Sequence, residues 1–64
     1  MIDEERLVRL KELLSDAEAC ARLTQWENDF CDSMREKVLT YGLRLNLSDK
    51  QEDVLSRIEG KVYA

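Results

Sequence analysis

The chain has 64 residues, of which 14 are Asp or Glu and 10 are Lys or Arg, so its formal charge is −4 in the absence of any His. Hydrophobic residues make up 44% of it, which is too many for a disordered tail. No uncharged run approaches the roughly 20 residues of a membrane-spanning helix, and the acidic start at residues 1–5 differs from a secretory signal. We therefore expect a soluble, cytoplasmic, single helical domain over residues 1–64 that has no membrane contact.

The first helix is predicted over residues 3–14. Its first turn is acidic at residues 3–5, where the free N–H groups of a helix start favour negative charge. Leu7, Leu10 and Leu14 then recur at helical spacing. These three leucines predict one apolar face.

The end of this helix is open to two interpretations. Residues 15–18 read Ser-Asp-Ala-Glu, which is the S-x-x-E pattern of a capping box. Either a new helix begins after Ser15, which makes four helices in all, or the first helix continues to about residue 21.

A second helix is predicted over residues 25–41. Thr24 and Glu27 form a T-x-x-E capping box before it, and Gly42 follows as a typical helix terminator. We expect Trp26 in this helix to anchor the core; a partly exposed contact with a partner is the alternative. The predicted apolar stripe is Trp26, Phe30, Met34, Val38 and Tyr41.

The segment after Gly42 alternates apolar and polar residues, which is typical of extended backbone. We expect a connector that places Leu43, Leu45 and Leu47 on the core; a two-stranded ribbon between two copies of the chain is the alternative. An S-x-x-Q capping box at Ser48 then predicts a third helix over residues 49–59.

The predicted fold is all-α: a small three-helix bundle, or a four-helix bundle if Ser15 breaks the first helix. Gly60 is expected to end the third helix, which forms an antiparallel pair with the second. A domain this small buries only about 60% of its unfolded surface, so we expect self-association to support it. The predicted core is Leu7, Leu10, Leu14, Trp26, Phe30, Met34, Val38, Leu45, Leu47, Val54, Leu55 and Ile58.

The sequence lacks the residue types of most reactive sites. Without His there is no Cys–His or Ser–His pair for nucleophilic catalysis, and Cys20 and Cys31 alone do not make a tetrahedral metal site. The acidic residues at 29, 32 and 36 fit a solvated helix face better than an acid–base pair. We expect no enzyme, no metal and no cofactor. Both cysteines are expected to be small buried apolar residues, with a disulfide as the alternative.

Acidic side chains are concentrated in the first third of the chain. Carboxylates there indicate a surface for a protein partner that normally meets phosphates, and ordinary solubility is the alternative. The predicted partner surface consists of Glu4, Glu5, Glu12, Asp16 and Glu18.

Two other binding modes are weighed against this one. Direct DNA or RNA binding is disfavoured, because the cations of the third helix are interleaved with carboxylates; its contacts would be Arg44, Lys50, Arg57 and Lys61. A structural homo-oligomer or homodimer would be held by the stripe Leu7, Leu10 and Leu14.

Residues 23–30 fit an LTxWExxF pattern, and residues 47–58 fit an LSxKQxxVLxRI pattern. Together these two stretches resemble a small, mostly uncharacterised module of phage and mobile-element proteins. The resemblance carries no catalytic residues and spans about residues 23–62. It implies a non-enzymatic protein-interaction module in the host cytoplasm. Such a module would bind a host or phage protein that handles nucleic acid and would modulate or inhibit it.

Overall fold

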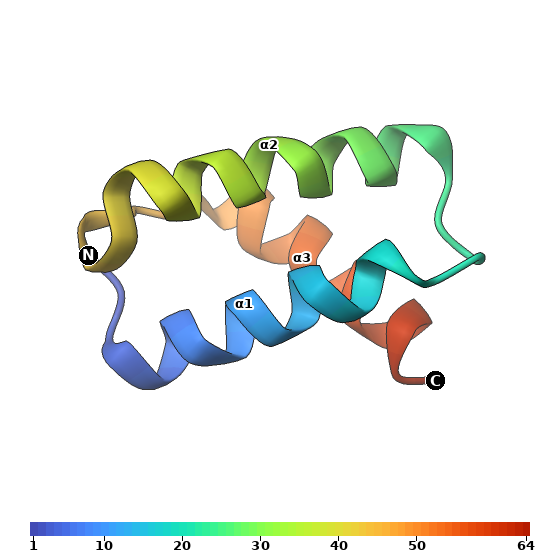
Figure 1. Ribbon diagram of the computed structural model, residues 1–64, viewed down its shortest axis with the longest axis horizontal. Helices are drawn as coiled ribbons and strands as arrows, with labels where there is room; N and C mark the ends of the chain where they lie inside the picture. Colours follow the sequence, from blue (N-terminus) through green and yellow to red (C-terminus); the bar gives the residue numbers. More distant parts are fainter.

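The computed structural model covers residues 1–64 and contains three α-helices and no strand (Figure 1). Helix α1 spans Glu4–Glu18, α2 spans Gln25–Tyr41 and α3 spans Asp49–Val62. A short 3₁₀ helix, η1, follows α2 at Gly42–Arg44. The all-α, three-helix prediction is confirmed. None of the helices has the length and apolar character that crossing a membrane requires.

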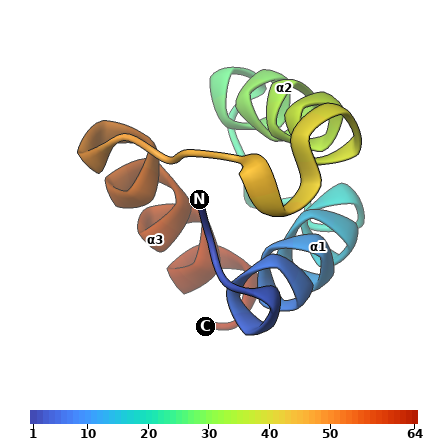
Figure 2. The same ribbon diagram turned by 90° about the vertical axis from the view of Figure 1, so that its left-hand side faces the viewer.

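Seen end-on, the three helices occupy the corners of a triangle (Figure 2). Helix α2 runs back along α1 in the opposite direction, while α3 crosses behind them (Figure 1). Among the three α-helices, the backbone contacts lie mainly between α1 and α2 and between α1 and α3. The expected antiparallel pair of α2 and α3 is therefore not the main packing unit; α1 is the central element.

Helix α1 is one continuous helix. Asp3 is its N-cap, and its carboxylate accepts a hydrogen bond from the Arg6 backbone N–H at 2.7 Å. The helix passes through Ser15 without a break because Leu13, Leu14 and Ala17 keep a continuous buried face across that position. It then ends at Glu18, so both the four-helix alternative and the extension to residue 21 are wrong.

Helix α2 begins and ends as its sequence predicts. Thr24 and Glu27 form the complete capping box, and Gly42 terminates the helix with a φ of +52°. The connector differs from the expectation, because it starts with η1 rather than extended backbone. Leu45 is buried and Leu47 half-buried, whereas Leu43 is exposed and does not reach the core.

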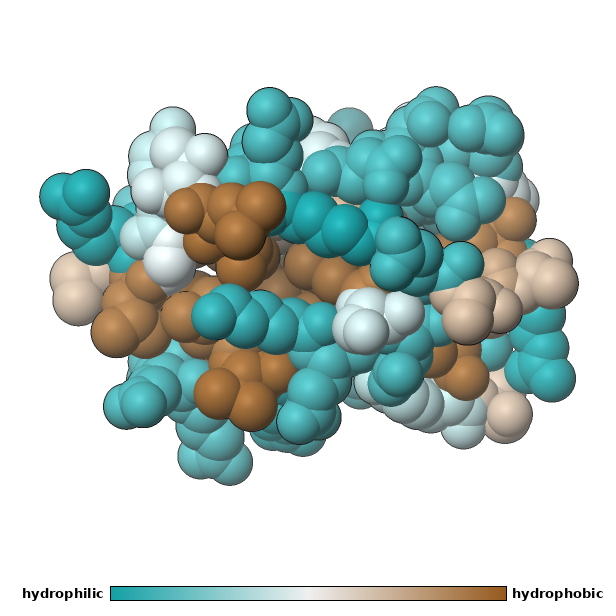
Figure 3. Space-filling model, viewed as in Figure 1, coloured by the Kyte–Doolittle hydropathy of each residue, from teal (hydrophilic) through white to brown (hydrophobic).

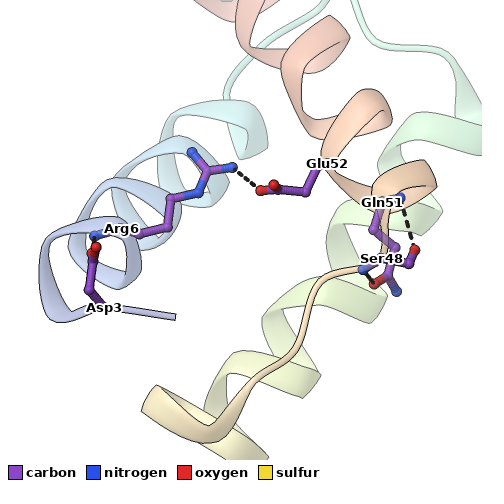
Figure 4. A network of polar contacts seen from close by, with 5 residues as sticks. All are labelled: Asp3, Arg6, Ser48, Gln51 and Glu52. Carbon is purple, nitrogen blue, oxygen red and sulfur yellow. Dashed lines mark hydrogen bonds and ion pairs between the residues drawn. The ribbon is translucent and has the colours of Figure 1, made fainter. Parts of the chain in front are cut away.

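Helix α3 is capped by Ser48 and Gln51, and it is tied to the start of α1 (Figure 4). Arg6 and Glu52 form an ion pair at 3.1 Å between the two helices. The helix continues through Gly60 to Val62, so the predicted end at residue 59 is wrong. Gly60 does not have the positive φ by which a glycine usually terminates a helix.

The core lies between the three helices, and all three contribute side chains to it. Leu13, Ala17, Leu23 and Cys31 belong to it although the predicted list omits them. The buried apolar residues are Leu7, Leu10, Leu13, Leu14, Ala17, Leu23, Cys31, Met34, Val38, Leu45, Val54, Leu55 and Ile58.

Three predicted core residues are not buried. Trp26 is 59% exposed, while Phe30 and Leu47 are half-buried and pack against the core edge. The reason for Trp26 is geometric: each step of four residues turns a helical position by about 40°, because the helix has about 3.6 residues per turn. The stripe from Trp26 to Val38 takes three such steps, so its members spread around the helix and only Met34 and Val38 are buried.

Both cysteines are free thiols. Cys31 is buried, as expected, and burial raises the pKa of its thiol. Cys20 is only half-buried and packs against the core from the loop after α1.

A candidate docking groove between α2 and α3

A groove of about 430 Å³ opens between the first turn of α2 and the facing side of α3. We call it the Trp26 groove. One wall comes from the residues that begin α2, and the other comes from side chains spaced along α3. It is lined by Thr24, Trp26, Glu27, Lys50, Asp53, Val54, Arg57 and Lys61.

The capping box of α2 sets the position of Trp26. Thr24 is the N-cap, so Trp26 is the second residue of the helix and Glu27 the third. The Trp26 indole stacks on the Phe30 ring, with ring centroids 5.7 Å apart and planes 16° from parallel. An exposed indole that rests on a second aromatic ring is held in place and offers a large apolar contact area.

Glu27 forms the floor of the groove and is the only buried charged residue of the protein. Its Oε1 atom accepts hydrogen bonds from the Thr24 backbone N–H at 2.9 Å and from the Lys61 ammonium at 2.6 Å. The Lys61 hydrogen bond, followed by that of Thr24, holds the pKa of this carboxyl below its ordinary value. The start of α2 is thereby tied to the end of α3.

Three cations lie along the wall formed by α3. Lys50, Arg57 and Lys61 recur at helical spacing on one side of the helix. Arg57 pairs with Asp53 at 3.0 Å and Lys61 with Glu27, whereas Lys50 has no partner within the chain. The groove therefore combines one apolar ring with cations of which one is unpaired.

The buried carboxyl of the groove is not tuned for proton transfer at neutral pH. A general acid or base works best when its pKa lies near the working pH. Glu27 has a pKa below its ordinary value. Outside the groove, the hydrogen bond to Asp16 raises the pKa of Tyr63 to about 12. Both pKa values therefore lie further from neutral pH than the ordinary values of these groups.

The predicted acidic residues are all exposed, but they do not lie on one side of the molecule. Asp16 faces α3, where it accepts a hydrogen bond from the Tyr63 hydroxyl at 2.6 Å. Glu12 lies close enough to raise the pKa of the same tyrosine, and Glu5 lines a pocket with Glu52 of α3. Glu18 instead lines a groove on the α2 side of α1. Glu4, Glu5, Glu12, Asp16 and Glu18 thus do not form a single patch.

The other predicted sites are placed as follows. Lys50, Arg57 and Lys61 line the Trp26 groove together, whereas Arg44 is exposed on η1 outside it. The stripe Leu7, Leu10 and Leu14 is buried in the core of the single chain. That face is already covered by α2 and α3, so self-association through it would require helices to be exchanged between subunits.

Sequence reasoning missed the partnership that builds the groove. The T-x-x-E pattern identifies Glu27 as a cap, but nothing near it in the sequence indicates Lys61, which is 34 residues away.

Comparison of the chain with protein-family models, with curated proteins and with solved structures finds no match.

Proposed function

We propose that the protein is a non-enzymatic protein-interaction module that holds its partner in the Trp26 groove. The observation that supports this most strongly is the exposure of the only Trp of the chain, stacked on Phe30 at the groove edge. Tryptophan is enriched among the few residues that supply most of the binding energy of protein interfaces. An indole that lies 59% exposed can serve as the anchor for a partner.

The charges around Trp26 favour a protein partner over nucleic acid. A nucleic-acid site needs cations free to neutralise phosphates. Arg57 and Lys61 are paired with carboxylates of this chain, and Asp53 itself lines the groove. Lys50 remains free, so the groove suits a segment with an apolar side chain for the Trp26 ring and a carboxylate for Lys50.

Both sequence patterns of the phage-type resemblance contribute to this groove. Thr24, Trp26 and Glu27 come from the first pattern, and Lys50, Val54 and Arg57 come from the second. This meeting of the two patterns supports a role as a binding module. A partner that handles nucleic acid, and its modulation or inhibition, remain predictions of the resemblance.

The proposal is tested by comparing which proteins three immobilised variants retain from a lysate. Trp26→Ala removes the anchor, while Tyr41→Ala removes an exposed aromatic ring of the same helix outside the groove. We expect the wild type and Tyr41→Ala to retain the same proteins, and Trp26→Ala to lose them at least tenfold. Circular dichroism checks that both variants keep their helices.

Equal retention by all three variants would contradict a site at Trp26. A gel shift with single-stranded and duplex DNA and RNA tests the nucleic-acid alternative. Binding that weakens steeply with salt and is lost on Lys50→Glu would overturn the proposal in favour of a nucleic-acid site.

A further inference from the structure

A second groove lies on the other side of α2, where α1 and α2 pack together. It measures about 440 Å³ and shares no residue with the Trp26 groove. The space-filling view shows hydrophobic surface along this face, crossed and bordered by hydrophilic side chains (Figure 3). The groove is lined by Lys11, Leu14, Ser15, Glu18, Arg35, Val38 and Leu39. We call it the Leu39 groove.

Leu39 itself is the most conspicuous residue of this surface. Its side chain is 87% exposed, far more than that of any other leucine of the protein. It projects beside a floor made by Leu14 and Val38, which belong to the core. The face therefore offers both an apolar protrusion and an apolar hollow next to it.

Two unpaired charges of opposite sign lie on the α1 wall of the groove. Lys11 and Glu18 are seven residues apart on the same side of α1, and neither side chain forms an ion pair or hydrogen bond within the chain. The small residue Ser15 lies between them. Arg35, by contrast, is already engaged with Asp32 and with the Leu14 carbonyl oxygen, at 2.5 and 2.7 Å.

We propose that the occupant of the Leu39 groove is a second copy of this chain, related by a two-fold axis that passes near Ser15. A two-fold axis places the two α1 helices antiparallel, so that Lys11 of each copy faces Glu18 of the other. Leu39 of each copy then enters the apolar hollow of the other. A partner of one charge sign would satisfy only one end of this groove, whereas a second copy satisfies both.

The size of the face limits the area that this dimer can bury. The molecule measures 30 × 20 × 19 Å, and the α1–α2 face spans its two longer dimensions. A standard interface buries about 800 Å² per partner, which is about a sixth of the total surface of 4548 Å². A face this small lies at the lower end of that range, where many weak and transient complexes are found, so we expect a reversible dimer with an affinity of about micromolar.

Sedimentation velocity over about 1–300 µM, a range chosen around that affinity, measures the association directly. The wild type is expected to shift from its 7.5 kDa monomer to a dimer of 2 × 7.5 = 15 kDa as its concentration rises. Leu39→Glu is expected to stay monomeric throughout. Thr40→Glu adds the same charge at the neighbouring exposed position, outside the groove, and is expected to dimerise like the wild type.

Charge exchange tests the two-fold geometry. Lys11→Glu places two carboxylates opposite each other at both ends of the interface, and Glu18→Lys places two ammonium groups there. Each variant alone is expected to dimerise at least tenfold more weakly than the wild type. An equimolar mixture restores both pairs and is expected to form a heterodimer as readily as the wild type forms its dimer.

Three results would overturn the proposal. They are a wild type that remains a monomer at every concentration, a Leu39→Glu variant that still dimerises, and a mixture of the two charge variants that associates no better than each alone. The test is independent of the Trp26 groove, because none of these substitutions changes a residue that lines it.

Discussion

At Glu27 a single carboxylate oxygen joins two distant parts of the chain. It accepts hydrogen bonds from the amide that begins α2 and from the ammonium group of Lys61 near the end of α3. The side chain is 11% exposed, so few water molecules compete for these contacts. The carboxylate that caps α2 therefore also connects α2 to α3.

Glu27→Gln keeps the shape of this side chain but removes its charge. We expect the free energy of unfolding at pH 7 to fall by about 1–2 kcal/mol, because hydrogen bonds to charged groups are worth more than those between neutral groups and Lys61 is partly solvated. Urea denaturation followed by circular dichroism measures it. Glu36→Gln, an exposed position on the same helix, is the control and is expected to change stability little.

The ion pair of Glu27 and Lys61 also makes the folding stability depend on pH in the acidic range. The pKa of Glu27 in the folded protein is lowered from its ordinary value of 4.5, so the unfolded state binds more protons in this pH range. The contribution of Glu27 is therefore present above pH 4.5 and is lost as the pH falls through the folded pKa. The stability difference between the wild type and Glu27→Gln is expected to shrink as the pH falls below 4.5; a constant difference would contradict this role.

Tyr63 provides a second titration. Its hydrogen bond to Asp16, followed by partial burial and nearby carboxylates, raises its pKa from 10.0 to about 12. Asp16→Asn removes the negative charge, so we expect the pKa of Tyr63 to move back towards 10.0. Ultraviolet absorbance of the tyrosinate during alkaline titration, with Tyr63→Phe to assign the signal, measures this. Identical titrations of the wild type and Asp16→Asn would refute the contact.

At the scale of the elements, helix ends follow backbone geometry more closely than residue type. Gly42 ends α2 with a φ of +52°, which other residues adopt at a cost, whereas Gly60 is an ordinary helical position inside α3. Arg22 contacts the last turn of α3, where its guanidinium donates to the Lys61 carbonyl oxygen at 3.2 Å. A carbonyl near the helix end thus gains a partner from the loop after α1.

Replacing each of the two glycines by alanine is therefore expected to change the free energy of unfolding in opposite directions. A Cβ at residue 60 meets no atom within 4 Å, so Gly60→Ala should stabilise the protein by about 0.5–1 kcal/mol through higher helix propensity. Gly42→Ala also meets open space, but its positive φ should cost about 1 kcal/mol or more. Urea denaturation of the pair checks this, and changes of the same sign would contradict the assignment.

The helices were predictable from sequence where their signals are local. Thr24 and Ser48 begin α2 and α3 as their capping boxes indicate, because a cap involves only the next three residues. Ser15 has the same pattern but does not cap, since the buried face of α1 continues across it. The Trp26 groove was not predictable as a unit. It depends on the exposure of Trp26 and on the contact between Glu27 and Lys61, both of which follow from how the helices cross.

For the molecule as a whole, α1 is the helix on which the other two pack. Leu10 and Leu14 lie at its centre, and Arg6 ties its first turn to α3 at Glu52. Because α2 and α3 cover the side of α1 that carries the predicted leucine stripe, that stripe serves the single chain. The exposed apolar residues Trp26 and Leu39 instead lie on two different sides of α2.

The same substitution on these two kinds of site should have different effects. Leu10→Ala at 1% exposure should lower the free energy of unfolding by about 2–5 kcal/mol, which is enough to unfold much of so small a domain. Leu39→Ala should change it by less than about 0.5 kcal/mol in dilute solution, where the monomer prevails. Thermal unfolding followed by circular dichroism compares them. Comparable losses would contradict the burial of Leu10 or the exposure of Leu39.

The stack of Trp26 on Phe30 also makes the molecule its own optical probe. Because this is the only indole of the chain and it lies 59% exposed, its fluorescence arises from one place, in contact with water. A ligand that covers the ring displaces that water and shifts the emission to shorter wavelengths. Candidate ligands can therefore be titrated against the unlabelled protein, and the emission reports whether this particular ring has been covered.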